Sequence, residues 1–595
     1  MAKQPMNVSL YIAQRLRELG IDKLFAVPGD YVTPFMDQVL AANAIDMIPM
    51  PNEQIAAYAA DGYARSRGIG AFAVTYGVGS FSAVNAVAGS YVEHLPVIVI
   101  NGSPSTAQRQ TADLQGVLYH HATGNFGADR DVFANVTTEA VILDNADEAP
   151  AKIDAALSAA ISRSRPVYIE GLKDMWGAAC AAPVGKIQRE TFFCDQAALA
   201  EAVERTAEHL RRAKNPIVWT DVLIGRYHLV EEFEAFIRDT GLSFTTSLLG
   251  KSIVSEDLPG FVGTYDGPSA EPQTRRAVEE SDCILGLGVI MTDDYAGVVS
   301  VDFTRMILGG ASTVRVGYST YAHVPLEAYL PALRARLKRD GAVAKHRRAT
   351  RVEAPKTKPQ DTITFEGFFF DRMQDFIDDD MILVADESNS MYVSGSLHVA
   401  KNQYYSQAAW GSIGYATPGA IGIAAANPKK RLVVFAGDGG FQQIAQALAP
   451  MARLKQPTIV FVMNNDIYGI EQALVDVTFF TQPPNPPKAY NVLDKWDYAA
   501  LAKAFNCAAE CVETFAELDA VLKKLKRSRE TTLVHVVIPM RDLPWQIRIV
   551  GSDEPVLPPI PPAKAKLLKA DSARPHRSRV FALASAAPEP PRAKK

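Results

Sequence analysis

The sequence predicts an α/β protein built from three doubly wound parallel sheets. Short apolar runs rich in β-branched residues recur along the chain and alternate with longer segments of helical pattern. Runs that are apolar on both faces are typical of parallel strands covered by helices on both sides. With 595 residues, 48% of them hydrophobic and 21% charged, the chain can bury several cores.

The expected strands are the apolar runs themselves. In chain order they are 24–27, 71–76, 96–100, 166–170, 216–220, 283–290, 381–386, 431–437, 458–464 and 533–539. Between them we expect helices, including one that opens at Pro51-Asn52-Glu53-Gln54 and one that begins near Gln196.

Two shifts in composition divide the chain. The first lies around 182–196, between a strand and a new helix, and the second at 345–360, which is basic and nearly free of apolar residues. Three units follow, at 1–185, 195–342 and 361–550. Residues 551–595 are predicted to be a disordered basic tail, since from 556 onward they hold nine basic and two acidic residues.

Charge and cysteine content limit the classes of partner. The net charge of −5 and a pI near 6.1 give no reason to expect nucleic acid or a membrane surface. A basic tail can contact either, but a solvated extension is the preferred interpretation. There is no apolar run of about 18 residues and no signal-peptide pattern, and the five cysteines are scattered. We therefore expect a cytoplasmic protein.

A glycine-rich turn follows the expected strand 431–437 and carries the strongest local signal. It contains Asp438, and the next expected strand ends beside Asn465. Backbone N–H groups of such a turn can hold a phosphate, but a carboxylate there repels phosphate unless a cation lies between them. Carboxylate, amide and phosphate oxygens are ligands that Mg²⁺ prefers. The pattern predicts a phosphate and magnesium site.

This arrangement resembles the thiamine-diphosphate-binding motif. To about residue 550 the chain is similar to the pyruvate, indolepyruvate and phenylpyruvate decarboxylase group of 2-oxo acid decarboxylases. The resemblance implies a pyrimidine-binding domain at 1–185, a central domain at 195–342 and a diphosphate-binding domain at 361–550. It implies thiamine diphosphate and Mg²⁺ as cofactors, with the metal held by Asp438, Asn465 and the carbonyl of Ile467.

The resemblance also implies a wider set of cofactor contacts. They are Glu53, Asn389, Ser390, Gly411, Ile413, Gly437, Asp438, Gly439, Gly440, Asn465, Ile467 and Gly469. Ile413 is the expected aliphatic wedge that bends the cofactor. Relatives often carry Asp in place of Asn389 and a hydroxyl residue in place of Gly440.

Glu53 taken alone is an ordinary acidic residue in the first turn of a helix. By the resemblance, it shares a proton with the aminopyrimidine ring, so that an imino nitrogen becomes the internal base. Asp30, the pair His120 and His121, and Glu471 match the remaining catalytic positions of the group. An isolated turn carboxylate or a histidine pair is commonly structural, so their joint match is what favours a decarboxylase.

The implied reaction is the non-oxidative decarboxylation of a 2-oxo acid to an aldehyde and CO₂, through a cofactor carbanion and enamine. In this family the first and third units meet across subunits, so we expect a homodimer or homotetramer with active sites at the dimer interface. Met391 and Asp294 stand where pyruvate-specific members carry aromatic residues, and Ile470 and Leu474 are expected beside them. These positions favour a branched-chain, long-chain or aromatic substrate over pyruvate.

Two other classes stay open at this point. One is a carboligase of the acetolactate synthase type or a flavin-dependent oxidase, although the central unit has only Gly286-Leu287-Gly288 in place of a dinucleotide-binding motif. The other is a non-catalytic regulatory homologue, against which the retention of Glu53, Asp438, Asn465 and Glu471 argues.

Overall fold

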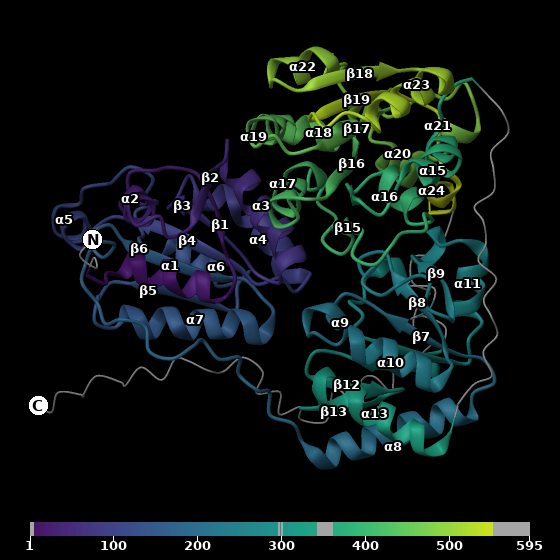
Figure 1. The fold of residues 1–595 in the computed structure, drawn as a ribbon, viewed down its shortest axis with the longest axis horizontal. Coiled ribbons are helices and arrows are strands. Elements are labelled where there is room, and N and C mark those ends of the chain that lie inside the picture. Colours follow the sequence, from purple (N-terminus) through teal and green to yellow (C-terminus); the bar gives the residue numbers. More distant parts are fainter. Residues whose placement is uncertain (1–4, 296–297, 299–301, 342–360, 551–595) are drawn as a thin grey trace, which may run out of the picture. The chain divides into compact units, whose positions relative to one another are not determined.

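A computed structural model describes residues 5–295, 298, 302–341 and 361–550. The expected linker 345–360 and the tail 551–595 lie outside these residues. The described chain forms three sheets with helices packed on them (Figure 1). Among the described helices, none combines the length and the apolarity that a membrane span requires.

The first sheet has six strands, all parallel. In sheet order they are β2 (Asp46–Pro49), β1 (Lys23–Ala26), β3 (Gly70–Thr75), β4 (Val97–Ser103), β6 (Val167–Leu172) and β5 (Glu139–Leu143). Its helices are α1 (Val8–Glu18), α2 (Thr33–Ala41), α3 (Glu53–Arg67), α4 (Ser80–Val92), α5 (Thr106–Gln115), α6 (Ala128–Phe133) and α7 (Ala149–Arg163).

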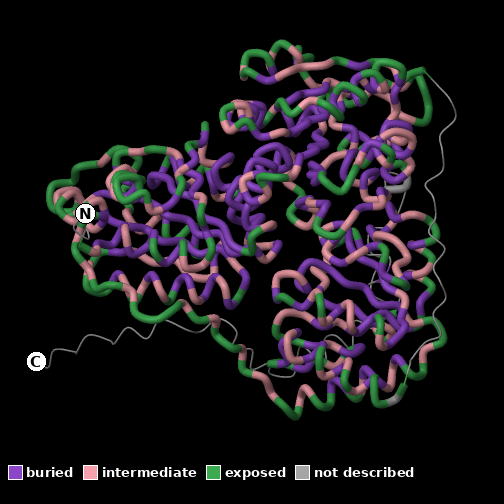
Figure 2. Tube along the Cα trace, in the orientation of Figure 1, coloured by how far each residue is buried: buried purple, intermediate pink, exposed green. Residues whose placement is uncertain are grey.

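Alternate residues of these strands enter two different cores. Phe25 and Phe72 pack into a core with α3 and α4, whereas Leu24 and Ala71 pack into another with α1, α2 and α7. Successive strand residues point to opposite faces, so a strand that is apolar throughout serves both cores. Figure 2 shows these strands as buried over most of their length.

The middle sheet has seven strands and is only mostly parallel. In sheet order they are β13 (Ser319–Ala322), β12 (Thr313–Val316), β11 (Met306–Gly309), β10 (Cys283–Leu287), β7 (Pro216–Thr220), β8 (Ser243–Ser247) and β9 (Phe261–Tyr265). The predicted parallel pairing is confirmed for most of this sheet, and the difference is that β12 pairs antiparallel with both β11 and β13. Its helices are α8 (Gln196–Arg212), α9 (Leu223–Arg226), α10 (Val230–Thr240), α11 (Pro272–Glu279) and α13 (Leu326–Asp340).

The third sheet again has six parallel strands. In sheet order they are β15 (Tyr404–Ser406), β14 (Met381–Ala385), β16 (Arg431–Gly437), β17 (Thr458–Asn464), β19 (Thr532–Val537) and β18 (Ala508–Val512). Its helices are α14 (Phe365–Phe368), α15 (Gln374–Phe376), α16 (Asn389–Ser394), α17 (Ala416–Ala426), α18 (Asp438–Ile444), α19 (Leu448–Arg453), α20 (Gly469–Asp476), α21 (Thr478–Thr481), α22 (Tyr498–Ala504), α23 (Phe515–Leu525) and α24 (Trp545–Val550).

One hydrophobic core joins the first and third sheets through α3 and α17. The helices touch at glycines: a Cβ on Gly422 would lie 1.8 Å from the carbonyl oxygen of Ala59, and one on Gly62 would lie 2.0 Å from that of Gly419. Both obstacles are backbone atoms, which cannot rotate away. Small residues at these positions therefore set how closely the two helices approach.

We expect Gly422→Ala to destabilise the protein by about 1–3 kcal/mol, because the added methyl must push the helices apart. Gly177→Ala is the matched control, since a Cβ on Gly177 meets no atom within 4 Å. Urea unfolding of both variants beside the wild type measures the difference. Equal midpoints for all three proteins would contradict the close packing.

Candidate active site

The glycine-rich turn after β16 forms a cradle around the carboxylate of Asp438. This carboxylate accepts hydrogen bonds from the backbone N–H groups of Gly439 (2.9 Å), Asn465 (3.1 Å) and Asp466 (2.7 Å). Asp438 is 3% exposed, and burial raises its pKa to about 7. Because β16 and β17 are parallel neighbours, their carboxyl ends bring Asp438 and Asn465 together, as the sequence predicted.

Two buried amide side chains beside this cradle each leave one polar atom unpaired within the described part of the chain. Neither Oδ1 of Asn389 nor Nδ2 of Asn465 has a hydrogen-bond partner among the described residues. A Cβ on Gly469 would lie 3.0 Å from Asn389 Nδ2 and 3.3 Å from Asn465 Nδ2, so the three residues converge. Buried polar atoms are normally satisfied, and these fit a ligand that carries hydrogen-bonding groups and a cation.

The oxygen set of Asp438, Asn465 and Ile467 has the chemistry of a magnesium site. It offers one carboxylate, one amide and one backbone carbonyl, and Mg²⁺ typically takes its other ligands from phosphate and water. Within the described residues, His, Cys, Asp and Glu form no group of three or more that could hold a metal without such a ligand. A diphosphate is therefore part of what this site requires.

A cavity of about 360 Å³ lies over the cradle. It is lined by most of the residues predicted in the third unit: Asn389, Gly411, Ile413, Gly437, Asp438, Gly439, Gly440, Asn465, Ile467, Gly469, Ile470, Glu471 and Leu474. Asp294, from the short 3₁₀ helix Asp293–Tyr295 of the middle unit, lines it as well. The cavity therefore draws on the middle and third units of one chain.

Of the residues predicted in the third unit, Met391 and Ser390 do not line this cavity. Met391 is 1% exposed and packs in the core on the far face of the third sheet, and Ser390 is fully buried with an unpartnered hydroxyl. Both lie on α16, where Asn389 and Tyr392 face the cavity in their place. Residues three apart share a helix face, whereas the two between them point elsewhere.

The segment that carries Gly411 and Ile413 is held by buried ionic contacts. Glu93 accepts hydrogen bonds from the backbone N–H groups of Ala409 (2.9 Å) and Trp410 (3.0 Å). The same carboxylate pairs with Arg65 at 2.5 Å, and both side chains are almost completely buried. On the other side of the segment, Asp386 accepts from the N–H groups of Gly414 and Ala416, both at 2.9 Å.

Glu53 begins α3, as predicted, at the carboxyl edge of the first sheet. Asn52 caps the helix by accepting a hydrogen bond from the N–H of Ile55 at 2.8 Å. The Oε1 atom of Glu53 lies beside Gly79, 3.3 Å from where a Cβ would stand. Burial raises the pKa of this carboxyl, which favours its protonated form relative to a solvated glutamate.

The histidine pair and Asp30 lie at the same edge as Glu53. The rings of His121 and Tyr76 have centroids 6.0 Å apart, and Tyr76 donates a hydrogen bond to the carbonyl of His120. Asp30 is close enough to raise the pKa of Tyr31, which burial raises first. Asp30, His120 and His121 are exposed in this chain, and neither they nor Glu53 line the cavity over Asp438.

Sequence reasoning missed the carboxyl group of Glu387, which lines the cavity and accepts a hydrogen bond from Tyr392. The signal was present, because Glu387 follows Asp386 directly after a strand apolar on both faces. The carboxyl end of a parallel strand is where ligands bind in such sheets. Trp410, which also lines the cavity, lies on the same segment as Gly411 and could have been included.

The fold and the cradle define an α/β protein of three sheets, with backbone N–H groups gathered around a buried carboxylate at the carboxyl ends of its third sheet. Comparison with known families gives its particular class. Residues 6–124 match the N-terminal TPP binding domain, 203–326 the central domain and 388–536 the C-terminal TPP binding domain of thiamine pyrophosphate enzymes. The chain belongs to the thiamine pyrophosphate enzyme family.

Similar proteins agree with this placement. An alpha-keto-acid decarboxylase of Mycolicibacterium paratuberculosis is 32% identical over 90% of this chain and 95% of its own length. A probable pyruvate decarboxylase of Schizosaccharomyces pombe is 29% identical over 94% and 98%. The solved structure of a Mycobacterium smegmatis protein, described as a thiamin diphosphate-dependent enzyme, superposes with a TM-score of 0.71 at 19% identity, covering 90% of this chain and 100% of that one, which supports the fold.

The buried contact between Glu93 and Arg65 yields a stability prediction. We expect Glu93→Ala to destabilise the protein by about 3–5 kcal/mol, since it leaves a buried guanidinium short of one carboxylate and two N–H groups without their acceptor. Lys23→Ala, which breaks the exposed pair with Asp46, should cost less than about 1 kcal/mol. Urea unfolding followed by tryptophan fluorescence compares the two variants, and similar losses in both would refute the special role of Glu93.

Proposed function

We propose that this protein catalyses the non-oxidative decarboxylation of a 2-oxo acid to an aldehyde and CO₂, with thiamine diphosphate and Mg²⁺ as cofactors. The observation that carries the proposal is the pair of unpartnered amides, Asn389 and Asn465, beside the Asp438 cradle in a member of the thiamine pyrophosphate enzymes. The alpha-keto-acid decarboxylases that resemble the chain over nine-tenths of its length support the reaction type.

The residues of the third unit hold the cofactor. When bound, thiamine diphosphate supplies a nucleophilic carbon and a cationic ring that accepts the electrons of the departing carboxyl group. Asp438, Asn465 and the Ile467 carbonyl would hold the metal together with the diphosphate. Ile413 would offer aliphatic surface to the cofactor, and the backbone of Gly411 would hold its pyrimidine.

The residues of the first unit manage protons. Glu53, whose pKa burial raises, holds a proton at the ring nitrogen of the aminopyrimidine and so keeps the amino group able to act as a base. Asp30, His120 and His121 transfer protons to and from the reacting carbon and oxygen atoms, and imidazoles are suited to this near neutral pH. Glu471, in the first turn of α20, faces the substrate carboxylate.

We propose that the active site forms between two copies of the chain, in a homodimer or a homotetramer. Asp30, Glu53, His120 and His121 do not line the described cavity over Asp438. Exposed apolar side chains lie close in sequence to both groups: Leu114 is 85% exposed and Leu118 is 71% exposed near the histidine pair, and Leu474 is 53% exposed near Glu471. Such side chains mark surfaces that a partner covers.

The lining of the cavity supports a substrate larger than pyruvate. Ile470 and Leu474 offer aliphatic surface, and Asp294 is a short side chain that leaves room beside them. Met391 packs in the core behind the wall of the cavity, where its flexible side chain can adapt to substrates of different shapes. A second candidate reaction, carboligation, draws on the same cofactor residues and is separated from decarboxylation by its product.

The direct test is to incubate the protein with thiamine diphosphate, Mg²⁺ and a panel of 2-oxo acids and to measure aldehyde release. We expect Glu53→Gln to keep the fold and cofactor binding but to lower turnover at least about a hundredfold, because general acid–base catalysis contributes about that much. Calorimetry with thiamine diphosphate provides the control for binding. Turnover of Glu53→Gln at the wild-type rate would refute the role of this carboxyl, and acetohydroxy acids in place of aldehydes would indicate a carboligase.

A shared active site predicts complementation between two inactive variants. Glu53→Gln damages the first unit and Asp438→Asn the third, so a dimer containing one copy of each has one damaged site and one intact site. Co-expression with two tags, followed by purification on both, isolates this mixed species. We expect about half of the wild-type activity per dimer, since one of the two symmetric sites is intact. An inactive mixed dimer would mean that each site lies within a single chain.

A further inference from the structure

We propose that the active-site cavity selects 2-oxo acids whose side chain ends in a cationic nitrogen group, a guanidinium or an ammonium, and disfavours a second carboxylate. This inference rests on the proposed function, because it names the class of substrate for that site. It is carried by an acidic wall formed by Glu387, Asp293 and Asp294, to which the proposed mechanism gives no role.

Within one chain, the charged side chains in the described lining of the cavity are all acidic. Its described lining holds five carboxyl groups and no lysine, arginine or histidine. Asp438 is accounted for by the metal and Glu471 by the substrate carboxylate, so the carboxyls of Asp293, Asp294 and Glu387 are left without a counter-charge. Glu387 is partly buried, whereas Asp293 and Asp294 are exposed in this chain, and all three carboxyls can attract a cation that enters.

The positions of the wall carboxyls are fixed by contacts from two units. Glu387 follows β14 and accepts a hydrogen bond from Tyr392 on α16. The carboxylate of Asp294 accepts from the hydroxyl of Thr292 at 3.0 Å, and its backbone packs tightly against Gly267, where a Cβ would lie 2.0 Å from the Asp294 oxygen. A preorganised pair of acceptors favours a ligand with several N–H donors.

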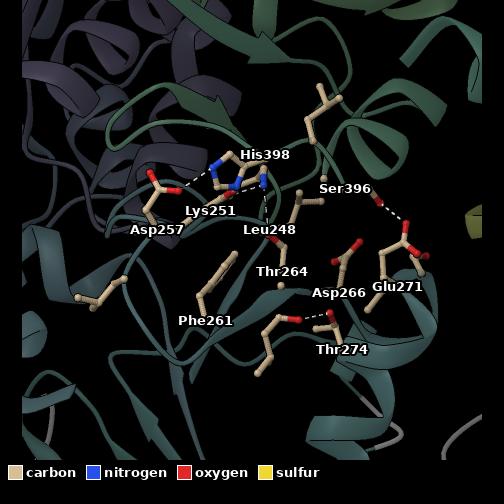
Figure 3. Close-up of a pocket in the computed structure, with 18 of the residues that line it drawn as sticks. Leu248, Lys251, Asp257, Phe261, Thr264, Asp266, Glu271, Thr274, Ser396 and His398 are labelled. Carbon is tan, nitrogen blue, oxygen red and sulfur yellow. Dashed lines mark hydrogen bonds and ion pairs between the residues drawn. The ribbon is translucent and has the colours of Figure 1, made fainter. Parts of the chain in front are cut away.

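A further buried carboxyl, Asp266, stands behind this wall in a second cavity of about 340 Å³ (Figure 3). Tyr392 lines both cavities. Asp266 is 9% exposed, and its Oδ2 atom has no hydrogen-bond partner among the described residues. Burial and the carboxyls of Asp294 and Asp266 raise the pKa of Glu387 to about 8, and burial and Asp294 raise that of Asp266 to about 8.

The other acidic residues of the second cavity have partners. Glu256 pairs with Lys251 at 2.7 Å, and Glu271 accepts a hydrogen bond from Ser396 at 2.8 Å (Figure 3). The carboxyl groups that lack a counter-charge are therefore concentrated at Asp266, Glu387 and Asp294, and a cation in the active-site cavity favours their ionised forms. A distal carboxylate on the substrate offers them no counter-charge and is repelled by any of them that is ionised.

The remaining surface of the cavity suits the stem of such a substrate. Ile413, Ile470 and Leu474 offer aliphatic contacts for the methylene groups between the keto carbon and the charged end. An apolar substrate of the same length uses this surface but leaves the wall carboxyls unpaired. We therefore expect a higher kcat/KM for a substrate with a cationic end than for an apolar substrate of the same length.

Three substrates matched in size test this selection: 5-guanidino-2-oxopentanoate, 7-methyl-2-oxooctanoate and 2-oxoheptanedioate, which differ in carrying a cationic, an apolar or an anionic end. We expect the wild-type kcat/KM for the guanidino substrate to exceed that for the apolar one at least about tenfold, and the dicarboxylate to be the poorest. Glu387→Gln and Asp294→Asn keep the shape of the wall, and each should reduce the ratio of guanidino to apolar substrate toward one. Glu271→Gln, which removes a carboxyl from the second cavity only, should keep the wild-type ratio.

Two results would overturn the inference while leaving the proposed function intact. One is a wild-type preference for the apolar substrate. The other is an equal loss on all three substrates in Glu387→Gln, accompanied by weaker thiamine diphosphate binding in calorimetry, since this carboxyl would then serve the cofactor. If no 2-oxo acid of any kind releases an aldehyde, the proposed function fails, and this inference fails with it.

Discussion

The geometry of the site depends on the contacts that the buried guanidinium of Arg65 makes. It joins Asp61 at 2.7 Å, Glu93 at 2.5 Å and the carbonyl of Ser406 at 2.9 Å, and its plane lies over the ring of Tyr415. Arg65 sits near the end of α3, and Glu53 stands at its beginning, about 18 Å away at 1.5 Å per residue. A single helix therefore presents Glu53 at one end and, at the other, anchors the segment of the third unit that carries Gly411 and Ile413.

This anchoring explains why the first and third units share a core, although the predicted site residues of the first unit do not line the cavity over Asp438. The glycine contacts between α3 and α17 hold the two sheets at a fixed distance within one chain. Under the proposed function, the carboxyl edges of the two sheets carry complementary halves of the chemistry, acid–base groups on one and phosphate and metal groups on the other. A twofold arrangement of two chains would complete both halves at once and give two equivalent sites at one interface.

The sequence was informative where a single physical rule decides the structure. All ten expected strands are present, because runs apolar on both faces have few alternatives to a parallel sheet. Strands at the sheet edges, such as β5 and β18, were missed because exposure on one side removes that pattern. The rule that ligands bind at strand ends located Asp438 and Asn465. Met391 was placed by resemblance alone, and the phase of α16, which only coordinates reveal, turns it away from the cavity.

The carboxyl groups around the cavity pose a physical problem that the pKa of Glu387 resolves. A 2-oxo acid is an anion, and five ionised carboxylates would repel it from a site with no basic side chain in its described lining. With a pKa near 8, Glu387 is mostly protonated at neutral pH, so the wall does not oppose entry of the substrate carboxylate. A cationic end that reaches Glu387 lowers this pKa and restores the charge, and the attraction then appears only for a substrate long enough to place its own cation there. Glu387 would therefore ionise only when the cationic end of a substrate reaches it. An acidic cavity of this kind can still admit a 2-oxo acid, which is itself an anion.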